Sequence, residues 1–370
     1  MIVRHAKKNL IGLTLEQVKH ELQAAPTVKP YTALQIWQHM YRHGSTSFRT
    51  MTNLPTTLRD HLHSHYTLDY GHVQSDQTSV DGTRKWLVGF NDPRAVVESV
   101  LIPEPKRHTL CVSSQIGCSL RCSFCHTGTQ KLLRNLTAGE IVGQVMLAAH
   151  GVRQFEQQGQ NSITRKKLLS HMVFMGQGEP LYNPRQVFQA IQVLTDRQGL
   201  QWPKQKITVS TSGVVPLIPK ISELGVALAI SLHATRNSLR DVLVPLNKTF
   251  PMETLMDACT QYARDSNGQR ITFEYVMLDG VNDSMGEARD LVKLLKQLPA
   301  HVNLIPFNPW PGSIYKTSKP EQVERFAETV QNGGIYCTVR RPRGQDILAA
   351  CGQLRSSEER KRATAAAAAL

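Results

Sequence analysis

The sequence predicts an α/β protein in which a complete or partial barrel of βα units follows a small helical domain. After residue 108, strand-like runs such as TLCVSS, HMVFMG and KITVST alternate with helical segments such as NPRQVFQAIQVL. This alternation is typical of a parallel sheet whose strands are connected by helices. Before it, residues 10–65 carry apolar side chains at helical spacing, as in LTLEQVKHELQ and YTALQIWQHMYRHG.

Changes of pattern along the chain predict four segments. Residues 1–75 are expected to form a helical accessory domain, and 76–107 a β-hairpin linker built on TRKWLVGF and AVVESVLI. Residues 108–354 form the barrel, and the alanine-rich tail 355–370 receives no function. The polar stretch from Arg153 to Lys167 is expected to be an exposed insertion. In barrels of this kind the functional side chains lie at the C-terminal ends of the strands.

The chain is strongly basic. Its 370 residues include 43 Lys and Arg against 29 Asp and Glu, which gives a formal net charge of +14. Such an excess favours a polyanionic partner, with nucleic acid as the leading candidate, although a solvated basic surface has the same composition. The N-terminus lacks the apolar stretch of a signal peptide, and no segment has eighteen consecutive apolar residues. We therefore expect a cytoplasmic protein with no membrane partner.

Four of the seven cysteines, beginning with Cys111, fall within fifteen residues, which in a cytosolic chain indicates metal binding or catalytic thiols. Cys118, Cys122 and Cys125 form a CxxxCxxC loop directly after the first predicted barrel strand. Three thiolates at this spacing suit three corners of a [4Fe-4S] cluster and leave the fourth iron open to an outside ligand. The alternative is a zinc ion with His126 or a remote cysteine as fourth ligand, although zinc usually uses paired CxxC knuckles.

Small and polar residues recur where successive predicted strands end. Gly178 and Glu179 follow the second strand in MGQGEP, where glycine lets a ligand approach the backbone closely. Each of the other candidates could be a helix cap or a strand terminator, but together they predict a ligand pocket. They are Ser210 after the third strand, Ser231, Leu232 and His233 after the fourth, and Asn308 after the sixth.

The loop CSLRCSFC resembles the cluster loop of the radical S-adenosylmethionine superfamily, and MGQGEP is similar to the superfamily motif that receives the methionyl ammonium. Over a longer span, TLCVSSQIGC, GQGEPLYN, STSGVVP, LVPLNK, LIPFNPWPG and AACGQL together resemble the RlmN methyltransferases, with the Cfr group as nearest neighbour. The match runs from about residue 10 to 354 and includes QIWQHMY and MTNLP. The resemblance implies a partial (βα)6 barrel, one [4Fe-4S] cluster, S-adenosylmethionine as methyl donor and radical source, and an external one-electron reductant such as flavodoxin or ferredoxin.

The same resemblance implies the reaction and its residues. RlmN enzymes methylate C2 of adenine 2503 in 23S rRNA and of adenine 37 in certain tRNAs, and they consume two S-adenosylmethionine molecules per turnover. Their S-methylcysteine aligns with Cys351, their resolving cysteine with Cys111 and their catalytic carboxylate with Glu98. The implied route carries the methyl group on Cys351, passes through a covalent protein–RNA adduct and ends with a transient disulfide. Without the resemblance, a lone cysteine such as Cys351 is more often buried filler.

Two other readings stay open on the sequence. A Cfr-type enzyme that methylates C8 carries the same cysteines, although LTLEQVKHEL and QIWQHMY favour RlmN. A zinc-bearing RNA-binding protein explains the charge and the cysteine loop, but not Cys351, Glu98 or the polar strand ends. Gln177 and His126 depart from the common RlmN pattern, in which an apolar residue and a serine are usual. Basic residues expected near the RNA, which could equally be a solvated face, are Arg340, Arg341 and Arg343.

Overall fold

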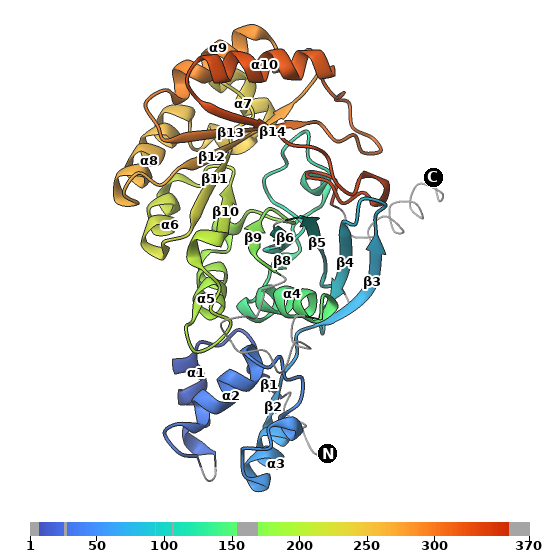
Figure 1. The fold of residues 1–370 in the computed structure, drawn as a ribbon, viewed down its shortest axis with the longest axis vertical. Coiled ribbons are helices and arrows are strands. Elements are labelled where there is room, and N and C mark those ends of the chain that lie inside the picture. The colour runs from blue at the N-terminus through green and yellow to red at the C-terminus, as the bar shows by residue number, and fades with distance from the viewer. Residues whose placement is uncertain (1–6, 26–27, 93, 106, 154–168, 355–370) are drawn as a thin grey trace.

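The computed structural model describes residues 7–25, 28–92, 94–105, 107–153 and 169–354. The predicted insertion, from residue 154 onward, and the tail 355–370 lie outside the described residues. The main feature of the fold is a ten-stranded mixed sheet with the order β14-β13-β12-β11-β10-β9-β6-β5-β4-β3 (Figure 1).

The larger part of this sheet is parallel and confirms the predicted α/β class. Its strands are β6 (Arg107–Cys111), β9 (His171–Phe174), β10 (Ile207–Thr211), β11 (Ala227–Ser231), β12 (Ile271–Met277), β13 (Ala300–Pro306) and β14 (Tyr336–Val339). The helices that connect them are α4 (Ala138–Gly151), α5 (Pro184–Thr195), α6 (Ile218–Leu224), α7 (Asn237–Leu243), α8 (Met252–Asp265), α9 (Met285–Leu295) and α10 (Pro320–Asn332). The result is six βα units followed by β14, and the curved sheet is an open, partial barrel.

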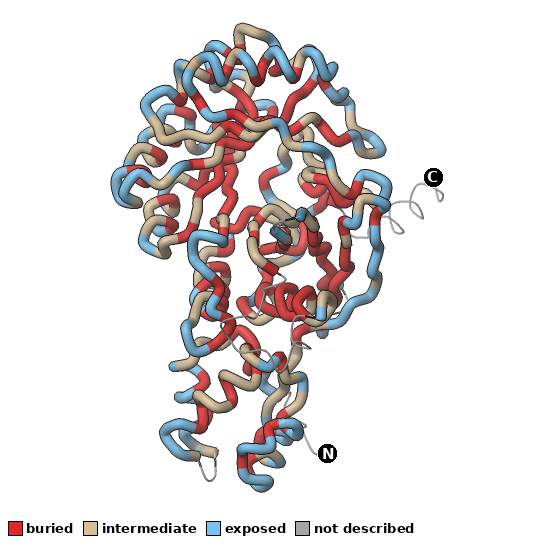
Figure 2. Tube along the Cα trace, in the orientation of Figure 1, coloured by how far each residue is buried: buried red, intermediate tan, exposed pale blue. Residues whose placement is uncertain are grey.

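Three antiparallel strands extend the same sheet beyond β6. They are β3 (His72–Thr78), β4 (Arg84–Gly89) and β5 (Val96–Glu104). The segment 76–107, predicted as a hairpin linker, therefore contributes most of this extension to the main sheet. β5 is buried over most of its length (Figure 2), and Val100 and Ile102 on one of its faces cluster with Ala349 and Leu354 of the chain that follows β14.

The N-terminal region is helical and lies at the end of the molecule opposite α9 and α10 (Figure 1). It contains α1 (Leu15–Glu21), α2 (Thr32–Tyr41) and α3 (Thr56–His65), while β1 (Lys8–Asn9) and β2 (Tyr66–Thr67) pair in parallel and close it. Thr14 and Gln17 form a capping box that starts α1, in which each side chain satisfies a backbone N–H of the other.

Glycines allow this helical region to dock closely on the barrel. Gly12 has φ +85°, and a Cβ there would lie 2.2 Å from the backbone nitrogen of Gly139 at the start of α4. A Cβ on Gly143, one turn further along α4, would lie 2.3 Å from the carbonyl oxygen of Tyr70. Trp37 on α2 completes the contact by donating from Nε1 to Asp196 Oδ1 at 3.2 Å, just beyond α5. Only glycine fits these backbone contacts.

Candidate active site

A cleft of about 990 Å³ opens at the C-terminal ends of the parallel strands. Most of the site residues predicted from the sequence line it: Cys118, Cys122, Cys125, Gly178, Glu179, Ser210, Ser231, His233 and Cys351. Residues that lie far apart in the sequence therefore converge on one cleft, as expected of strand ends in a barrel.

The CxxxCxxC loop forms one wall of this cleft. It is closed at its base by β7 (Gln115–Ile116) and β8 (Arg134–Asn135), which pair in antiparallel fashion. Gly117 begins the loop with φ +78°, and a Cβ there would lie 2.3 Å from the carbonyl oxygen of Lys131. Within the loop, the backbone N–H of Cys125 donates to the carbonyl of Cys122 at 3.1 Å. This turn holds the thiol-bearing segment compact against the cleft.

The chemistry of these thiols fits an iron–sulfur cluster. Burial raises the pKa of the Cys118 thiol to about 12, and it also raises the pKa of Cys122 and Cys125. Such thiols are neutral at neutral pH, and they ionise when a bound metal supplies the compensating positive charge. Among the described residues, no three His, Cys, Asp or Glu side chains meet at one point as the ligands of a single ion do. A cubane takes each thiolate on a different iron.

Glu179 is one of two buried carboxyl groups that line the cleft, and the other is Glu274. The Oε1 of Glu179 accepts from the backbone N–H of Leu181 at 3.1 Å, and its Oε2 accepts from Ser212 N–H at 2.9 Å. Burial raises the pKa of Glu179 to about 7, although these hydrogen bonds oppose the shift. Gly178 beside it has φ +94°, and a Cβ there would lie 2.5 Å from Gln115 Cβ. The position and buried charge of Glu179 suit an ammonium group in the cleft.

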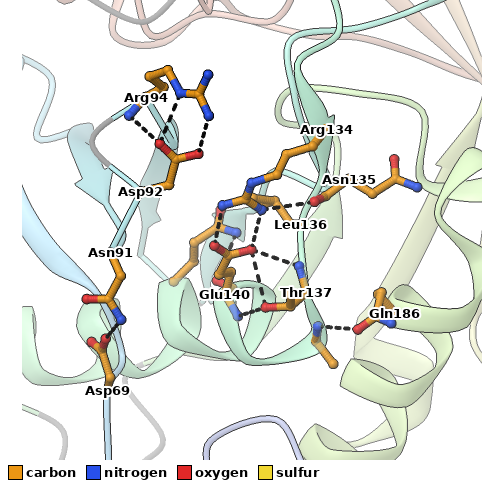
Figure 3. A network of polar contacts seen from close by, with 12 residues as sticks. Asp69, Asn91, Asp92, Arg94, Arg134, Asn135, Leu136, Thr137, Glu140 and Gln186 are labelled. Atoms are coloured by element: carbon orange, nitrogen blue, oxygen red, sulfur yellow. Dashed lines mark hydrogen bonds and ion pairs between the residues drawn. The ribbon is translucent and has the colours of Figure 1, made fainter. Parts of the chain in front are cut away.

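A polar network ties Glu179 to the base of the cysteine loop. Gln115 accepts from the Glu179 N–H at 2.9 Å and donates to Asn135 Oδ1 at 2.8 Å. Next to Asn135, Arg134 forms a two-pronged ion pair with Glu140, whose backbone N–H bonds the Thr137 hydroxyl (Figure 3). The capping box of α4 thus holds Arg134 at the return of the cysteine loop, and Asn135 beside it connects through Gln115 to Glu179.

Arg240, on α7, orders the ends of β10 and β11. Its guanidinium is fully buried and donates to the carbonyls of Ser212 at 2.7 Å, Ser231 at 3.0 Å and Leu232 at 3.1 Å. Burial lowers its pKa to about 10, so it keeps its charge at neutral pH. Leu232 is itself buried and lies outside the cleft lining. Arg240 is not predicted as a site residue from the sequence, because nothing in RNSLRDVL distinguishes a buried arginine from a solvated one.

His233 stands in a left-handed conformation, with φ +60°, at the end of β11. Its Nδ1 accepts from the Val276 N–H at 3.1 Å, and Phe124 of the cysteine loop packs edge-on against its ring with centroids 4.6 Å apart. Burial lowers the pKa of His233 to about 3, and the nearby Arg240 charge adds to the shift. The ring is therefore neutral.

Cys351 lies at the border between this cleft and a second, smaller pocket. The second pocket, of about 460 Å³, is lined by Cys351, Cys111, Arg340 and apolar side chains from β5 and β13. Burial raises the pKa of Cys111 to about 12, with the Cys351 thiol raising it further and Arg340 opposing. Asn308 belongs to this pocket, not to the larger cleft, and donates to the Cys351 carbonyl at 3.3 Å.

The predicted disulfide is absent from this state of the molecule. All seven cysteines, which are all among the described residues, are free thiols. Cys259 and Cys337 are buried and away from the cleft. A bond between Cys111 and Cys351 is thus no part of the folded structure described here.

The cysteine loop also fastens the segment that carries Cys351. The His126 N–H donates to the Gly352 carbonyl at 2.8 Å, its Nδ1 lies 3.2 Å from the Gln353 carbonyl, and the Thr127 hydroxyl donates to the Leu354 carbonyl at 2.7 Å. The ring of His126 stacks on Trp310 with centroids 4.7 Å apart. His126, the departure from the common pattern, thus contacts the Cys351 segment through its backbone and its ring.

Glu98 is buried on β5 and lies outside the linings of both pockets. Its Oε1 pairs with the Lys85 ammonium at 3.1 Å, and its backbone N–H donates to Gln177 Oε1 at 3.4 Å. Glu98 shares a face of the sheet with Val100, which packs against Cys111 and Ala349. The carboxylate is therefore on the side of the sheet that the Cys351 segment covers.

Comparison with known proteins decides the family. The radical SAM superfamily model matches residues 112–292, and the model of the ribosomal RNA large subunit methyltransferase N-terminal domain matches 8–68. A dual-specificity RNA methyltransferase RlmN from Rhodopseudomonas palustris (strain BisB5) is 50% identical over 96% of this chain and 91% of its own length. The chain belongs to the RlmN family.

Other relatives agree with RlmN membership. The RlmN protein of Beijerinckia indica subsp. indica is 50% identical over 96% of this chain and 95% of its own length. The crystal structure of a radical SAM methyltransferase from Sphaerobacter thermophilus superposes with a TM-score of 0.87 at 42% identity, covering 94% of this chain and 99% of that one. The predictions of a radical S-adenosylmethionine enzyme and of its barrel with an N-terminal RlmN domain are confirmed. In the part of the chain that the structure describes, no helix combines the length and apolar character needed to cross a membrane.

Proposed function

We propose that this chain methylates C2 of adenine in RNA, at position 2503 of 23S rRNA and position 37 of tRNAs, and that the methyl group passes through Cys351. The RlmN relatives, which carry the name of dual-specificity RNA methyltransferases, support the substrate class. One observation supports the route above all others. Cys351 lines both the cleft of the cluster cysteines and the pocket of Cys111, so one thiol can serve both.

The cofactors of the proposal are a [4Fe-4S] cluster on Cys118, Cys122 and Cys125, and S-adenosylmethionine in the remaining cleft. When bound, they supply a methyl group from one S-adenosylmethionine and, from a second, a radical that removes a hydrogen atom from that methyl group. Glu179 would receive the methionyl ammonium. The groups proposed for the rest of the molecule are Gly178, Ser210, Ser231 and His233, which line the cleft, whereas the predicted contacts Leu232 and Asn308 lie outside its lining.

The reaction needs a protein-borne methyl group because C2 of adenine is an electrophilic amidine carbon and cannot attack a sulfonium methyl itself. Cys351 does so instead, losing its thiol proton as the sulfur–carbon bond forms. The methylene carbon on Cys351 then bonds to C2. The adduct gives its C2 proton to Glu98 and one electron to an acceptor of the iron–sulfur class, which restores the aromatic ring.

Cys111 completes the turnover. Its thiolate attacks the sulfur of Cys351, a disulfide forms, and the sulfur–carbon bond breaks with its electron pair going to the methylene carbon. That carbon takes up a proton and becomes the methyl group of the product. Arg340 lines the same pocket and lowers the pKa of Cys111, which favours the attacking form. Two electrons from an external reductant, such as flavodoxin or ferredoxin, then reopen the disulfide.

RNA recognition in the proposal rests on charge and on the accessory domain. A net charge of +14 suits phosphate binding, and the N-terminal family model supports assigning residues 1–75 to the RNA. Arg341 is exposed and available to phosphates, whereas Arg340 faces the thiol pocket. The target base must leave its stack to reach the cleft, so an adenine in a loop is the expected substrate.

Nucleoside analysis of methylated RNA tests the proposal. The reconstituted enzyme is incubated with transcripts of the 23S rRNA region and of tRNA, and digested nucleosides are separated by mass and retention time. We expect 2-methyladenosine from the parent enzyme and none from Cys351→Ala. Formation of 8-methyladenosine would assign a Cfr-type reaction, and the absence of methyladenosine from a cluster-loaded enzyme would overturn the proposal.

A further inference from the structure

Lys85 is a buried lysine on β4 whose ammonium reaches both Glu98 and the segment that carries Cys351. The residue is 4% exposed, and lysine is almost never buried so deeply unless it is paired. Its Nζ lies 3.1 Å from Glu98 Oε1, 2.5 Å from the carbonyl oxygen of Ile347 and 3.4 Å from that of Leu348. The three acceptors match the three protons of an ammonium group.

The sheet register places Lys85 in line with the reacting thiols. Lys85 lies opposite Val100 on β5, and Val100 lies opposite Cys111 on β6. Directly paired residues project to the same face of a sheet, so Lys85 and Cys111 face the same covering segment two strands apart. Glu98 is two residues from Val100 and lies on that face as well.

The carbonyls that Lys85 binds belong to the turn from which Cys351 extends. Ile347 and Leu348 are followed directly by Ala349, Ala350 and Cys351. Leu348 has φ +51°, a left-handed conformation that a leucine adopts only when its surroundings hold it. The Lys85 ammonium is one such restraint, because it donates hydrogen bonds to the carbonyls of both Ile347 and Leu348.

We propose that Lys85 is a positioning residue that holds Glu98 as a carboxylate and, at the same time, fixes the turn that aims Cys351 at the target carbon. The inference rests on the proposed function, in which Glu98 takes the C2 proton of the adduct. In that step the C2–H bond breaks, the proton goes to Glu98, the bonding pair stays in the ring, and one electron leaves to an iron–sulfur acceptor.

The ammonium acts on this step through charge. A carboxyl group as buried as Glu98 favours its neutral, proton-bearing form, in which it cannot accept a proton. A positive charge at 3.1 Å favours the carboxylate instead. Removing the charge should therefore leave methyl transfer to Cys351 intact but slow the loss of the C2 proton, so that the covalent protein–RNA adduct accumulates.

Three variants of the full-length, cluster-loaded enzyme separate charge from structure. Lys85→Gln keeps a hydrogen-bond donor for the Ile347 carbonyl but removes the charge, Lys85→Met removes both, and Lys85→Arg keeps the charge. Arg84→Met is the matched control. Arg84 precedes Lys85 on β4, and the substitution breaks its ion pair with Asp76 on β3. Each is given S-adenosylmethionine, a reductant and a tRNA transcript, and methylated Cys351, adduct and methylated RNA are followed over one turnover.

We expect adduct resolution to slow by about 100-fold in Lys85→Gln, the lower end of the range for losing a general base, and by at least as much in Lys85→Met, which also releases the turn. Lys85→Arg should recover most of the rate, and Arg84→Met should behave as the parent. In a Glu98→Gln background, Lys85→Gln should add nothing, because the charge acts through Glu98 and the glutamine keeps a donor for the turn. Cys351 methylation without RNA should stay within about 3-fold of the parent in all variants, since the loss is assigned to the later base step.

The role of Lys85 and the proposed function of the enzyme fail on different results. Absence of methylated Cys351 or of RNA product in the parent enzyme would refute the proposed function itself. If the parent reacts and Glu98→Gln accumulates adduct, then parent-like resolution in Lys85→Gln would refute the role of Lys85. So would an equal slowing in Lys85→Gln and Lys85→Arg, or a full additional loss in the Glu98→Gln background. If Lys85→Met does not fold, Lys85→Gln and Lys85→Arg decide the matter.

Discussion

Replacing Arg240 with methionine should loosen the edge of the cleft that the ends of β10 and β11 form. The buried guanidinium makes hydrogen bonds of 2.7–3.1 Å to the carbonyls of Ser212, Ser231 and Leu232, and one of 3.0 Å to Asn247 Oδ1. Methionine fills a similar volume but leaves all four acceptors without this donor.

The contacts set the size of the effect. A hydrogen bond to a charged group contributes about 1.5–3 kcal/mol net, and the cost of burying the guanidinium offsets part of the sum of four. We therefore expect Arg240→Met to lower the free energy of unfolding by about 3–5 kcal/mol. Affinity for S-adenosylmethionine should fall on the order of 10- to 100-fold, because the supporting contacts of a binding group are lost.

Urea unfolding of the anaerobic protein measures the first quantity, and isothermal titration of the cluster-loaded enzyme with S-adenosylmethionine measures the second. Lys293→Met is the control, since Lys293 pairs with Asp290 at 3.1 Å on the exposed surface of α9 and should change stability by less than about 0.5 kcal/mol. A loss below about 1 kcal/mol in Arg240→Met, or unchanged S-adenosylmethionine affinity, would refute the reasoning, because either means that the guanidinium does not order these strand ends.

Three further changes probe other parts of the structure. Gly178→Ala places a Cβ 2.5 Å from Gln115 at φ +94°, so it should lower the free energy of unfolding by about 2–4 kcal/mol. It should also abolish S-adenosylmethionine binding as measured by titration, and binding like that of the parent would contradict this. Gly12→Ala places a Cβ 2.2 Å from Gly139, so it should displace the helical region and reduce RNA methylation, while methylation of Cys351 in the absence of RNA persists. If mass spectra show an equal loss of both methylations, the helical region has no separate accessory role. Because the pKa of Glu179 is raised to about 7 in the fold, the folded chain binds more protons there than the unfolded chain between about pH 4.5 and 7, and its contribution to stability falls as pH rises through that window. In urea unfolding, the decrease in the free energy of unfolding between pH 5 and pH 8 should be smaller by roughly 2–3 kcal/mol in Glu179→Gln than in the parent. If the free energy of unfolding of parent and variant changes equally with pH, the raised pKa of Glu179 is ruled out.

The predictions from sequence succeed where the signal is local. The CxxxCxxC loop and the glycine of MGQGEP are read from neighbouring residues, and the alternation of strands and helices after residue 108 fixes the order of the barrel. Because parallel strands bring their C-terminal ends to one edge, Ser210, Ser231 and His233 could be assigned to one site before any contact was known.

The remaining features depend on contacts between distant segments, which the sequence does not encode locally. Arg240 and Lys85 look like ordinary surface cations until their partners, 7 to 28 and 13 to 263 residues away respectively, surround them in the fold. Asn308 follows a strand as expected, but its side chain donates to the Cys351 carbonyl and lies in the second pocket.

Isotope transfer through Cys351 tests the central claim most directly. The enzyme is first loaded with S-adenosylmethionine that carries a trideuterated methyl group, freed of excess cofactor, and then given unlabelled S-adenosylmethionine, a reductant and RNA for one turnover. If the methyl group passes through Cys351, the first product should carry a methyl group with two deuterium atoms and one solvent hydrogen, and the third deuterium should appear in 5′-deoxyadenosine. An unlabelled methyl group in the first product, with the label still on Cys351, would contradict the account.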